Sequence, residues 1–229
     1  MNVLVLGKEK TGALIAQIAC DRGHTVRVLN SHESMSASGL LNGSLSSLDV
    51  VMDFTSADAV LANICAYARA GINMLVGSTG WYSELARVRE EVEHAGIGLI
   101  YGANFALALG SVLDAIEPAP FANPNARSGS LASRFNPRGA WPAGFSLSPQ
   151  MLQERHGLKL DVTAVRKRET VGQQTLAFDC GSDSFLVTHD ARSQRSTAEG
   201  ALRAAEWLRG KHGLYDLNSI CRRHPAAGA

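Results

Sequence analysis

The sequence predicts an α/β protein built on a doubly wound parallel sheet. Five short apolar runs in the first half of the chain each end in a turn, and these turns fall at Gly7, Asn30, Asp53, Gly77 and Ala103. Successive turns are 23, 23, 24 and 26 residues apart, a length that accommodates a strand, a helix and their loops. Strands that alternate with helices at such a step form a parallel sheet with helices on its faces.

Each strand and helix of this domain has a local signal. The strands are short, continuous apolar runs, as is typical of strands buried on both faces. Gly23 follows the first helix, where a C-terminal glycine is favoured. Ser56 is a candidate N-cap for the second helix, and Gly71 follows that helix. The expected strands span 3–6, 25–29, 50–52, 73–76 and 97–101, and the expected helices span 11–21, 56–69 and 82–94.

Composition and charge are those of an ordinary globular chain. Its 229 residues are 45% hydrophobic and suffice for one large domain or two small ones. A net charge of +1 gives no electrostatic reason to expect nucleic acid or an acidic membrane as a partner. The four cysteines have neither the spacing of a metal site nor that of a disulfide framework, so free thiols without a bound metal are expected. The apolar run at the start of the chain is too short for a signal peptide, which favours a cytoplasmic location. The cysteines are Cys20, Cys65, Cys180 and Cys221.

The character of the sequence changes after Glu117. Segment 118–153 holds six of the seven prolines together with many serines, glycines and arginines, and it has neither helical nor strand periodicity. This segment is therefore expected to be irregular, although so long a structureless run is unusual in a compact domain. Beyond it, three antiparallel strands and an amphipathic helix are expected at 160–168, 175–179, 185–189 and 197–208, respectively.

A candidate dinucleotide site opens the first helix. Ligands of open parallel sheets bind outside the carboxyl ends of the strands, and Gly7–Gly12 (GKEKTG) follows the first strand there. The fingerprint G-x-G-x-x-G has a glycine where this chain has Glu9, whose carboxylate would cost about 2–3 kcal/mol beside a phosphate. Flanking lysines and the helix N-terminus could offset that cost; the alternative is a plain strand–turn–helix without a ligand. The candidate cofactor-binding residues here are Gly7, Lys8, Lys10, Thr11 and Gly12.

The turn after the second strand bears on the choice of cofactor. NAD-preferring sites commonly have Asp or Glu there to hold the ribose hydroxyls, whereas this chain has Asn30, Ser31 and His32. The missing acid leaves room for a 2′-phosphate, which slightly favours NADPH over NADH. The alternative is that Asn30 and Ser31 only form the turn.

Three further turns carry a family resemblance. Asp53–Thr55 (DFT), Gly77–Trp81 (GSTGW) and Gly102–Phe105 (GANF) follow successive strands. In this order and spacing they resemble dihydrodipicolinate reductase (4-hydroxy-tetrahydrodipicolinate reductase) of bacterial lysine synthesis, which reads D-F-T, G-T-T-G and (A/S/P)-N-F. The match covers about two thirds of the chain and resumes at Val165–Val171, Thr188–Ala191 and Ala198–Leu217.

The resemblance implies a Rossmann-like dinucleotide-binding domain at 1–105 and 196–229, with a smaller α+β substrate and oligomerisation domain inserted at 106–195. It implies hydride transfer from NADH or NADPH to a cyclic imine or enamine dicarboxylate, and a homotetramer held through the inserted sheet. The alternative for the three turns is plain strand–helix punctuation. By position, the further cofactor-binding residues would be Asp53, Thr55, Gly77, Ser78, Thr79, Gly102, Ala103, Asn104 and Phe105.

The catalytic half of the resemblance is incomplete. The family signature is E-x-H-H-x-x-K-x-D-A-P-S-G-T-A, which supplies a proton donor and groups that bind two carboxylates. In the nearest stretch, Glu154–Asp161 (ERHGLKLD), His156 matches the first histidine and Gly157 replaces the second. His156 is thus the candidate acid and Lys159 the candidate carboxylate anchor; the alternative is that both are plain surface residues. A competing placement uses Asn125–Ser130 as the anion loop but lacks His and Lys.

Three functions therefore remain open. The leading hypothesis is an NAD(P)H-dependent reductase of a cyclic imine or enamine dicarboxylate in lysine and diaminopimelate biosynthesis. The second is a catalytically impaired dinucleotide-binding paralogue, either a sensor or inert. The third is a related reductase whose substrate specificity was rebuilt by segment 118–153, which could equally be a disordered insert or a sequence error.

Overall fold

The chain divides into two compact units. One comprises Met1–Ala106 and Thr197–Ala229, and the other comprises Leu107–Ser196. Each boundary lies one residue from the domain boundary that the resemblance implies. The computed structural model describes residues 1–7, 10–29, 47–102, 104–106, 128–135, 159–166, 172–179, 184–217 and 220.

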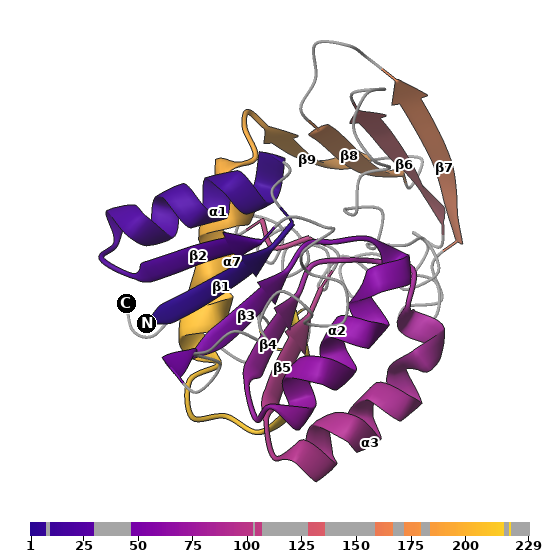
Figure 1. Cartoon of the computed structure of the whole chain (residues 1–229). Coiled ribbons are helices and arrows are strands. Elements are labelled where there is room, and N and C mark those ends of the chain that lie inside the picture. Colours follow the sequence, from indigo (N-terminus) through magenta and orange to yellow (C-terminus); the bar gives the residue numbers. More distant parts are fainter. Residues whose placement is uncertain are drawn as a thin grey trace, which may run out of the picture. The chain divides into compact units, whose positions relative to one another are not determined.

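The first unit contains a six-stranded sheet (Figure 1). Its strands lie in the order β10-β5-β4-β3-β1-β2, and each neighbouring pair runs parallel. This is the parallel α/β sheet that the sequence predicts. The strand bounds are β1 (Asn2–Leu6), β2 (Thr25–Leu29), β3 (Val50–Asp53), β4 (Asn73–Val76), β5 (Gly98–Tyr101) and β10 (Gly213–Asp216).

Helices cover both faces of this sheet, which confirms the doubly wound arrangement. Helices α1 (Lys10–Asp21) and α7 (Arg195–Trp207) pack on one face, whereas α2 (Ala57–Arg69) and α3 (Leu85–Ala95) pack on the other. The short 3-10 helix η3 (Tyr82–Glu84) precedes α3, so the helix predicted at 82–94 is divided into two segments. Among the described residues, no helix has the length and apolar character that a membrane crossing requires.

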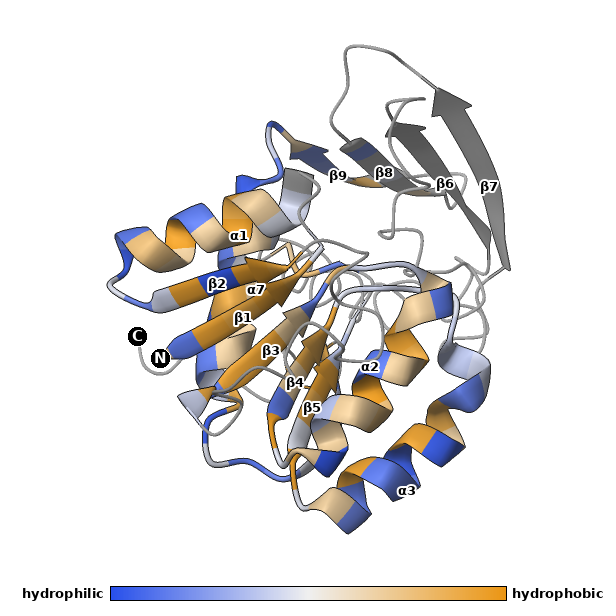
Figure 2. Ribbon diagram, in the orientation of Figure 1, coloured by the Kyte–Doolittle hydropathy of each residue, from blue (hydrophilic) through white to orange (hydrophobic). Residues whose placement is uncertain are grey.

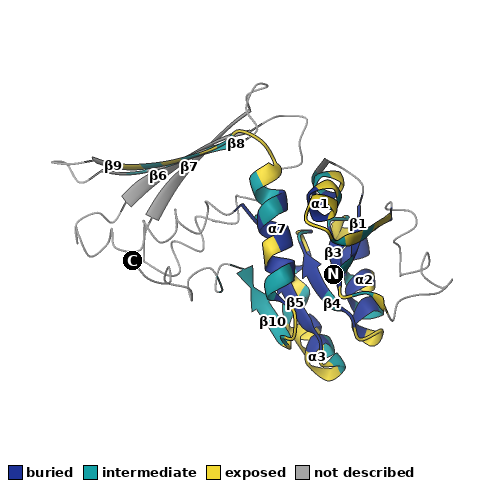
Figure 3. Cartoon of the chain, turned by 90° about the vertical axis from the view of Figure 1, so that its left-hand side faces the viewer, coloured by how far each residue is buried: buried dark blue, intermediate teal, exposed yellow. Residues whose placement is uncertain are grey.

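Two apolar layers hold the helices to the sheet. Strand β1 directs Leu4 and Leu6 towards the layer beneath α2 and α3, and it directs Val3 and Val5 towards the layer beneath α1 and α7. All four side chains are at most 1% exposed. Because both faces are covered, the central strands are nearly uniformly hydrophobic (Figure 2) and form the most buried part of the unit (Figure 3).

The sequence did not indicate the sixth strand, β10. It lies in the stretch that resembles the closing tail of the family, and it pairs with β5 so that Asp216 is the partner of Tyr101. Four residues that begin with a glycine carry too little apolar pattern to mark a strand. The backbone just before β10 packs closely on β5, because a Cβ at Gly98 would lie only 2.5 Å from the Lys211 carbonyl oxygen.

The second unit contains a four-stranded sheet. Its strands lie in the order β7-β6-β8-β9, where β6 and β7 are parallel and the other two pairs are antiparallel. The bounds are β6 (Ser128–Phe135), β7 (Lys159–Arg166), β8 (Gly172–Asp179) and β9 (Ser184–Ala191).

Two sequence predictions for this unit need correction. Strand β6 lies within segment 118–153, which was expected to be irregular; its backbone pairs on both sides, and this pairing outweighs the weak strand preference of its serines and glycine. Strand β7 was expected to be antiparallel but runs parallel to β6. Residues 136–158 separate the two strands, which is long enough for the crossover that a parallel pair requires.

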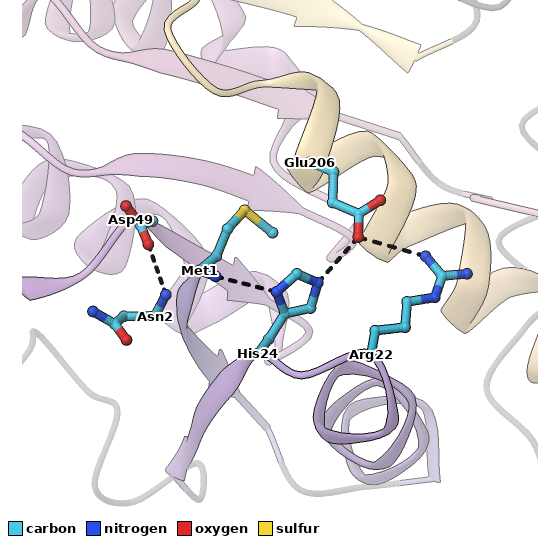
Figure 4. A network of polar contacts seen from close by, with 6 residues as sticks. All are labelled: Met1, Asn2, Arg22, His24, Asp49 and Glu206. Atoms are coloured by element: carbon cyan, nitrogen blue, oxygen red, sulfur yellow. Dashed lines mark hydrogen bonds and ion pairs between the residues drawn. The ribbon is translucent and has the colours of Figure 1, made fainter.

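A polar network joins α7 to the amino-terminal edge of the first sheet (Figure 4). Glu206 Oε1 lies 3.0 Å from His24 Nε2 and 3.6 Å from Arg22 Nη1. His24 Nδ1 lies 3.2 Å from the amino nitrogen of Met1. The network therefore links α7, which comes late in the chain, to β1 and to the turn between α1 and β2.

Candidate functional site

The strand order reverses at one point in the first sheet. From β1 the chain moves to β2 on one side, and it then returns to β3 on the other side of β1. The last residues of four adjacent strands are register partners along one edge, namely Leu6, Asp53, Val76 and Tyr101. In open parallel sheets, ligands bind outside the carboxyl ends of the strands at such a switch point. The predicted turns therefore share one edge.

The first and last glycines of the Gly7–Gly12 turn are required by close packing. Gly7 has a φ of 92°, and a Cβ there would lie 2.6 Å from the carbonyl oxygen of Phe54. A Cβ at Gly12 would overlap the carbonyl oxygen of Gly7. A dinucleotide fingerprint has glycines for the same two steric reasons, a tight turn and close packing of the helix on the strand. Gly7 and Gly12 bring the N-terminus of α1 close to the end of β1, where its amides can bind a phosphate.

Asp53 is the centre of a buried hydrogen-bond network. Its Oδ1 accepts bonds from the Thr55 amide at 2.8 Å, the Thr55 hydroxyl at 2.6 Å and the Ser78 hydroxyl at 3.2 Å. Its Oδ2 accepts a bond from Asn63 Nδ2 at 2.9 Å. The side chain of Asp53 is fully buried, and burial together with this carboxylate raises the pKa of Tyr67. Asp53 thus holds the loops together and presents no surface to a ligand.

The loop after β4 is fastened by Ser78 and leaves Thr79 outside. The Ser78 hydroxyl lies 3.0 Å from the Thr55 carbonyl oxygen, and the Ser78 carbonyl oxygen accepts a 2.8 Å bond from Trp81 Nε1. Ser78 is only 6% exposed, whereas Thr79 is exposed. Of these two predicted cofactor residues, Thr79 is the one with a side chain that can reach a ligand.

Aromatic packing shapes the neighbouring loops. A Cβ at Gly77 would overlap the ring of Phe54, so a larger residue there would require that ring to move. The rings of Phe54 and Phe105 meet edge to face at 6.2 Å, and Phe105 is 3% exposed. Asn104 Oδ1 accepts a bond from the Ala106 amide at 2.9 Å. Phe105 therefore packs in the core, and only its backbone remains for a cofactor.

Trp81, Tyr82 and Tyr101 form an aromatic cluster beside the same edge of the sheet. Trp81 is 1% exposed, and its ring packs in T-shaped geometry on the rings of Tyr82 and Tyr101. The ring centroids lie 5.3 Å apart for Tyr82 and 5.6 Å apart for Tyr101. Burial raises the pKa of Tyr82 to about 12, with further contributions from Asp216 and Tyr101. Burial and then Asp216 also raise the pKa of Tyr101, which Arg89 lowers. Both phenols are therefore neutral at physiological pH.

The remaining predicted residues differ in how far the structure describes them. Lys8, Ala103 and His156 lie outside the described residues, and Lys10 is placed only as the first residue of α1. Thr11 is half-buried in the first turn of α1, and Gly102 is buried after β5. Lys159 is the first residue of β7, where it pairs with Ser128 of β6. The structure thus brings together predicted cofactor residues that follow β1, β3, β4 and β5. Of the two catalytic candidates, His156 lies outside the described residues and Lys159 belongs to the second unit.

Strands β6 and β7 bear on where the catalytic signature lies. In the placement that uses His156, the signature counted on from Asp161 puts its S-G-T anion loop on Ala164–Arg166, which are part of β7. In the competing placement the loop includes Ser128–Ser130, which are part of β6. Both placements therefore put a strand where the signature has a loop.

A third placement puts the S-G-T loop on residues 143–145, which lie outside the described residues. It aligns the two histidines with Arg134 and Phe135, the last residues of β6, and it then retains Pro142 and Gly144 of the signature. Arg138 takes the place of the lysine. The sequence reading missed this placement because neither histidine is present to mark it.

The order of strands favours this third placement. The resemblance resumes at Val165, which lies in β7, and β7 follows β6 along the chain and in the sheet. A signature at the end of β6 therefore precedes β7, whereas one at Glu154–Asp161 runs into it.

Known proteins share this arrangement. The profiles described as dihydrodipicolinate reductase, N-terminus and C-terminus, match residues 2–105 and 106–221. The chain is 24% identical to 4-hydroxy-tetrahydrodipicolinate reductase of Christiangramia forsetii, over 96% of this chain and 97% of the relative. It is 28% identical to the protein of that name from Ralstonia nicotianae, over 79% and 76%. A dipicolinate-bound dihydrodipicolinate reductase from Paenisporosarcina sp. TG-14 has a TM-score of 0.70 at 16% identity, over 96% and 99% of the two chains.

The two profiles adjoin between residues 105 and 106, one residue from the point where the structure divides the units. The structural neighbour supports the Rossmann-like fold of the first unit. Members of this family take NADH or NADPH and act in lysine and diaminopimelate biosynthesis on a small-molecule substrate. The chain belongs to the dihydrodipicolinate reductase family of NAD(P)H-dependent oxidoreductases.

Proposed function

We propose that this protein reduces 4-hydroxy-tetrahydrodipicolinate, a cyclic imine dicarboxylate, with NADPH or NADH. The observation that supports this most strongly is the shared edge of β1, β3, β4 and β5, with Gly7 and Gly12 packed as a dinucleotide fingerprint requires. The proposed substrate is the one that appears in the names of the curated relatives.

In this proposal the cofactor lies along the carboxyl ends of the strands. The amides at the N-terminus of α1 hold the pyrophosphate, with Lys8 and Lys10 beside it. The exposed Thr79 hydroxyl and the backbone around Ala103 and Asn104 bind the nicotinamide half. The cofactor supplies a hydride to the substrate, and an acid on the protein supplies the proton.

The identity of that acid separates two versions of the proposal. If the signature lies at Glu154–Asp161, His156 donates the proton and Lys159 binds a carboxylate. If the signature lies at the end of β6, the chain has Arg134 and Phe135 in place of both histidines, and a dinucleotide-binding paralogue with impaired catalysis is favoured. Strand β7 at the expected anion loop is the observation that supports this second function.

The deciding experiment combines turnover with binding. Pyruvate and aspartate semialdehyde are condensed in situ, and NADPH and NADH oxidation is followed at 340 nm with wild-type protein and with His156→Ala. Turnover that His156→Ala abolishes supports reduction with His156 as the acid. Dinucleotide binding without turnover supports the impaired paralogue. Absence of dinucleotide binding in calorimetry would overturn both.

The proposal extends to assembly and location. The family resemblance supports a homo-oligomer and suggests a tetramer. A reaction that draws on the NAD(P)H pool supports a cytoplasmic location. Light scattering on the purified protein measures the assembly directly, and a monomeric mass would contradict it.

A further inference from the structure

We propose that Asp53, Asn63 and Trp81 are positioning residues, which set the shape of the dinucleotide loops without touching the dinucleotide. This inference rests on the proposed function, because it assumes that the loop Gly77–Gly80 contacts the cofactor.

Asp53 joins three segments that the chain keeps apart. Its carboxylate binds Thr55 in the turn after β3, Asn63 in α2 and Ser78 in the loop after β4. The Thr55 amide, the Thr55 hydroxyl and the Asn63 amide donate to its two oxygens. The single Ser78 hydroxyl proton is shared between Asp53 Oδ1 at 3.2 Å and the Thr55 carbonyl oxygen at 3.0 Å, and the Asp53 side chain is fully buried. Bonds to a charged acceptor are about twice as strong as neutral ones. The turn after β3 and the loop after β4 are therefore held at one spacing.

Asn63 fixes the direction in which the Asp53 carboxylate points. Among the described residues it is the side chain bound to Oδ2, and it is itself fully buried in α2. With Oδ2 held by α2, Oδ1 remains directed at Thr55 and Ser78. Loss of the Asn63 amide leaves a buried carboxylate oxygen without that donor, which costs more than the bond itself.

Trp81 fastens the same loop from the other side. Its Nε1 donates to the Ser78 carbonyl oxygen at 2.8 Å, while the Ser78 hydroxyl is held by Asp53. The Trp81 ring is itself wedged against Tyr82 and Tyr101. Ser78 is thus held at two atoms, and the next residue, Thr79, is left outward. A loop fixed in this way before binding has less entropy to lose when a ligand binds.

The test measures dinucleotide affinity in matched pairs of variants. Asn63→Leu removes the amide at similar volume, and Trp81→Phe removes the indole donor but keeps an aromatic ring. Asn73→Ala and Trp207→Phe are the controls: Asn73 Oδ1 accepts a 2.8 Å bond from the Gly98 amide at the opposite end of β4, and Trp207 packs on Tyr215. We expect the Kd for NADPH to rise about tenfold in each test variant and to stay unchanged in the controls.

A second measurement needs no ligand. Hydrogen exchange of the free proteins, followed by mass spectrometry, should show faster exchange at 77–81 in Asn63→Leu and Trp81→Phe. In Asn73→Ala the faster exchange should instead appear at 97–100. Test variants with unchanged exchange at 77–81 and wild-type Kd would overturn the positioning role. If the wild-type protein binds no dinucleotide but the variants show the expected differences in exchange, the proposed function is wrong. The role of these residues in holding the loop is then still supported.

Discussion

At the scale of single residues, glycines are the clearest link between the sequence and the site. Gly7 and Gly12 could be predicted as fingerprint positions because their spacing follows a strand, and the structure gives each a steric reason. The opposite directions of Ser78 and Thr79 could not be predicted. Both are small hydroxyl residues in one loop, and only the buried Asp53 determines which of them turns inward.

Gly12 provides a prediction at this scale. We expect Gly12→Ala to lower the free energy of unfolding by about 1–3 kcal/mol, because the added methyl group overlaps the Gly7 carbonyl oxygen. It should also weaken dinucleotide binding, since α1 must move away from the end of β1. Urea denaturation and calorimetric titration with NADPH measure the two effects.

Gly23→Ala is the control for this prediction. Gly23 has a φ of 79°, and nothing lies within 4 Å of a Cβ there, so the substitution costs about 1–2 kcal/mol through backbone strain alone. Its NADPH affinity should match that of the wild type. Equal affinity in Gly12→Ala and Gly23→Ala would show that close packing of α1 on Gly7 does not matter for binding.

At the scale of elements, the sequence predicts best the apolar strands in the first half of the chain. Thr25–Leu29 and Asn73–Val76 have the predicted bounds, and β1, β3 and β5 differ only by one residue at one end. Strands β6 and β10 could not be predicted, because Ser128–Phe135 alternates weakly and Gly213–Asp216 is too short. Their neighbours in the sheet, rather than their own residues, specify them.

The contact between α7 and the first strands gives the prediction at this scale. A double-mutant cycle with His24→Ala and Glu206→Ala should yield a coupling free energy of about 0.5–1 kcal/mol, since His24 is 14% exposed and its Nε2 lies 3.0 Å from Glu206. The cycle Arg89→Ala with Glu93→Ala is the comparison. That pair is more than half exposed and its atoms lie 3.9 Å apart, so about 0.3 kcal/mol is expected. Equal coupling in thermal unfolding would contradict a special role for the His24 contact.

At the scale of the whole molecule, the second unit is an insertion within one strand–helix–strand connection. Strand β5 ends at Tyr101, α7 follows the insertion, and β10 returns parallel to β5. A helix that connects parallel neighbours begins near the carboxyl end of the first strand. The insertion therefore occupies the connection between β5 and α7 of the first unit. The sequence suggested this insertion only through the family resemblance. The residues of the closing helix do not indicate which sheet it packs against.

This topology predicts that the first unit folds without the second. Replacing Leu107–Ser196 by a glycine–serine linker should give a protein with one cooperative thermal transition, because β5, α7 and β10 keep their core contacts. Under the proposed function it should bind NADPH with wild-type affinity and show no reductase turnover. Circular dichroism measures the thermal transition and calorimetry measures NADPH binding. Variants with two linker lengths show whether a failure comes from strain in the linker or from a wrongly chosen boundary. If both lengths give a protein without a cooperative transition, the strands and helices of the first unit depend on the insertion, and the division of the chain at residues 106 and 197 is not a folding boundary.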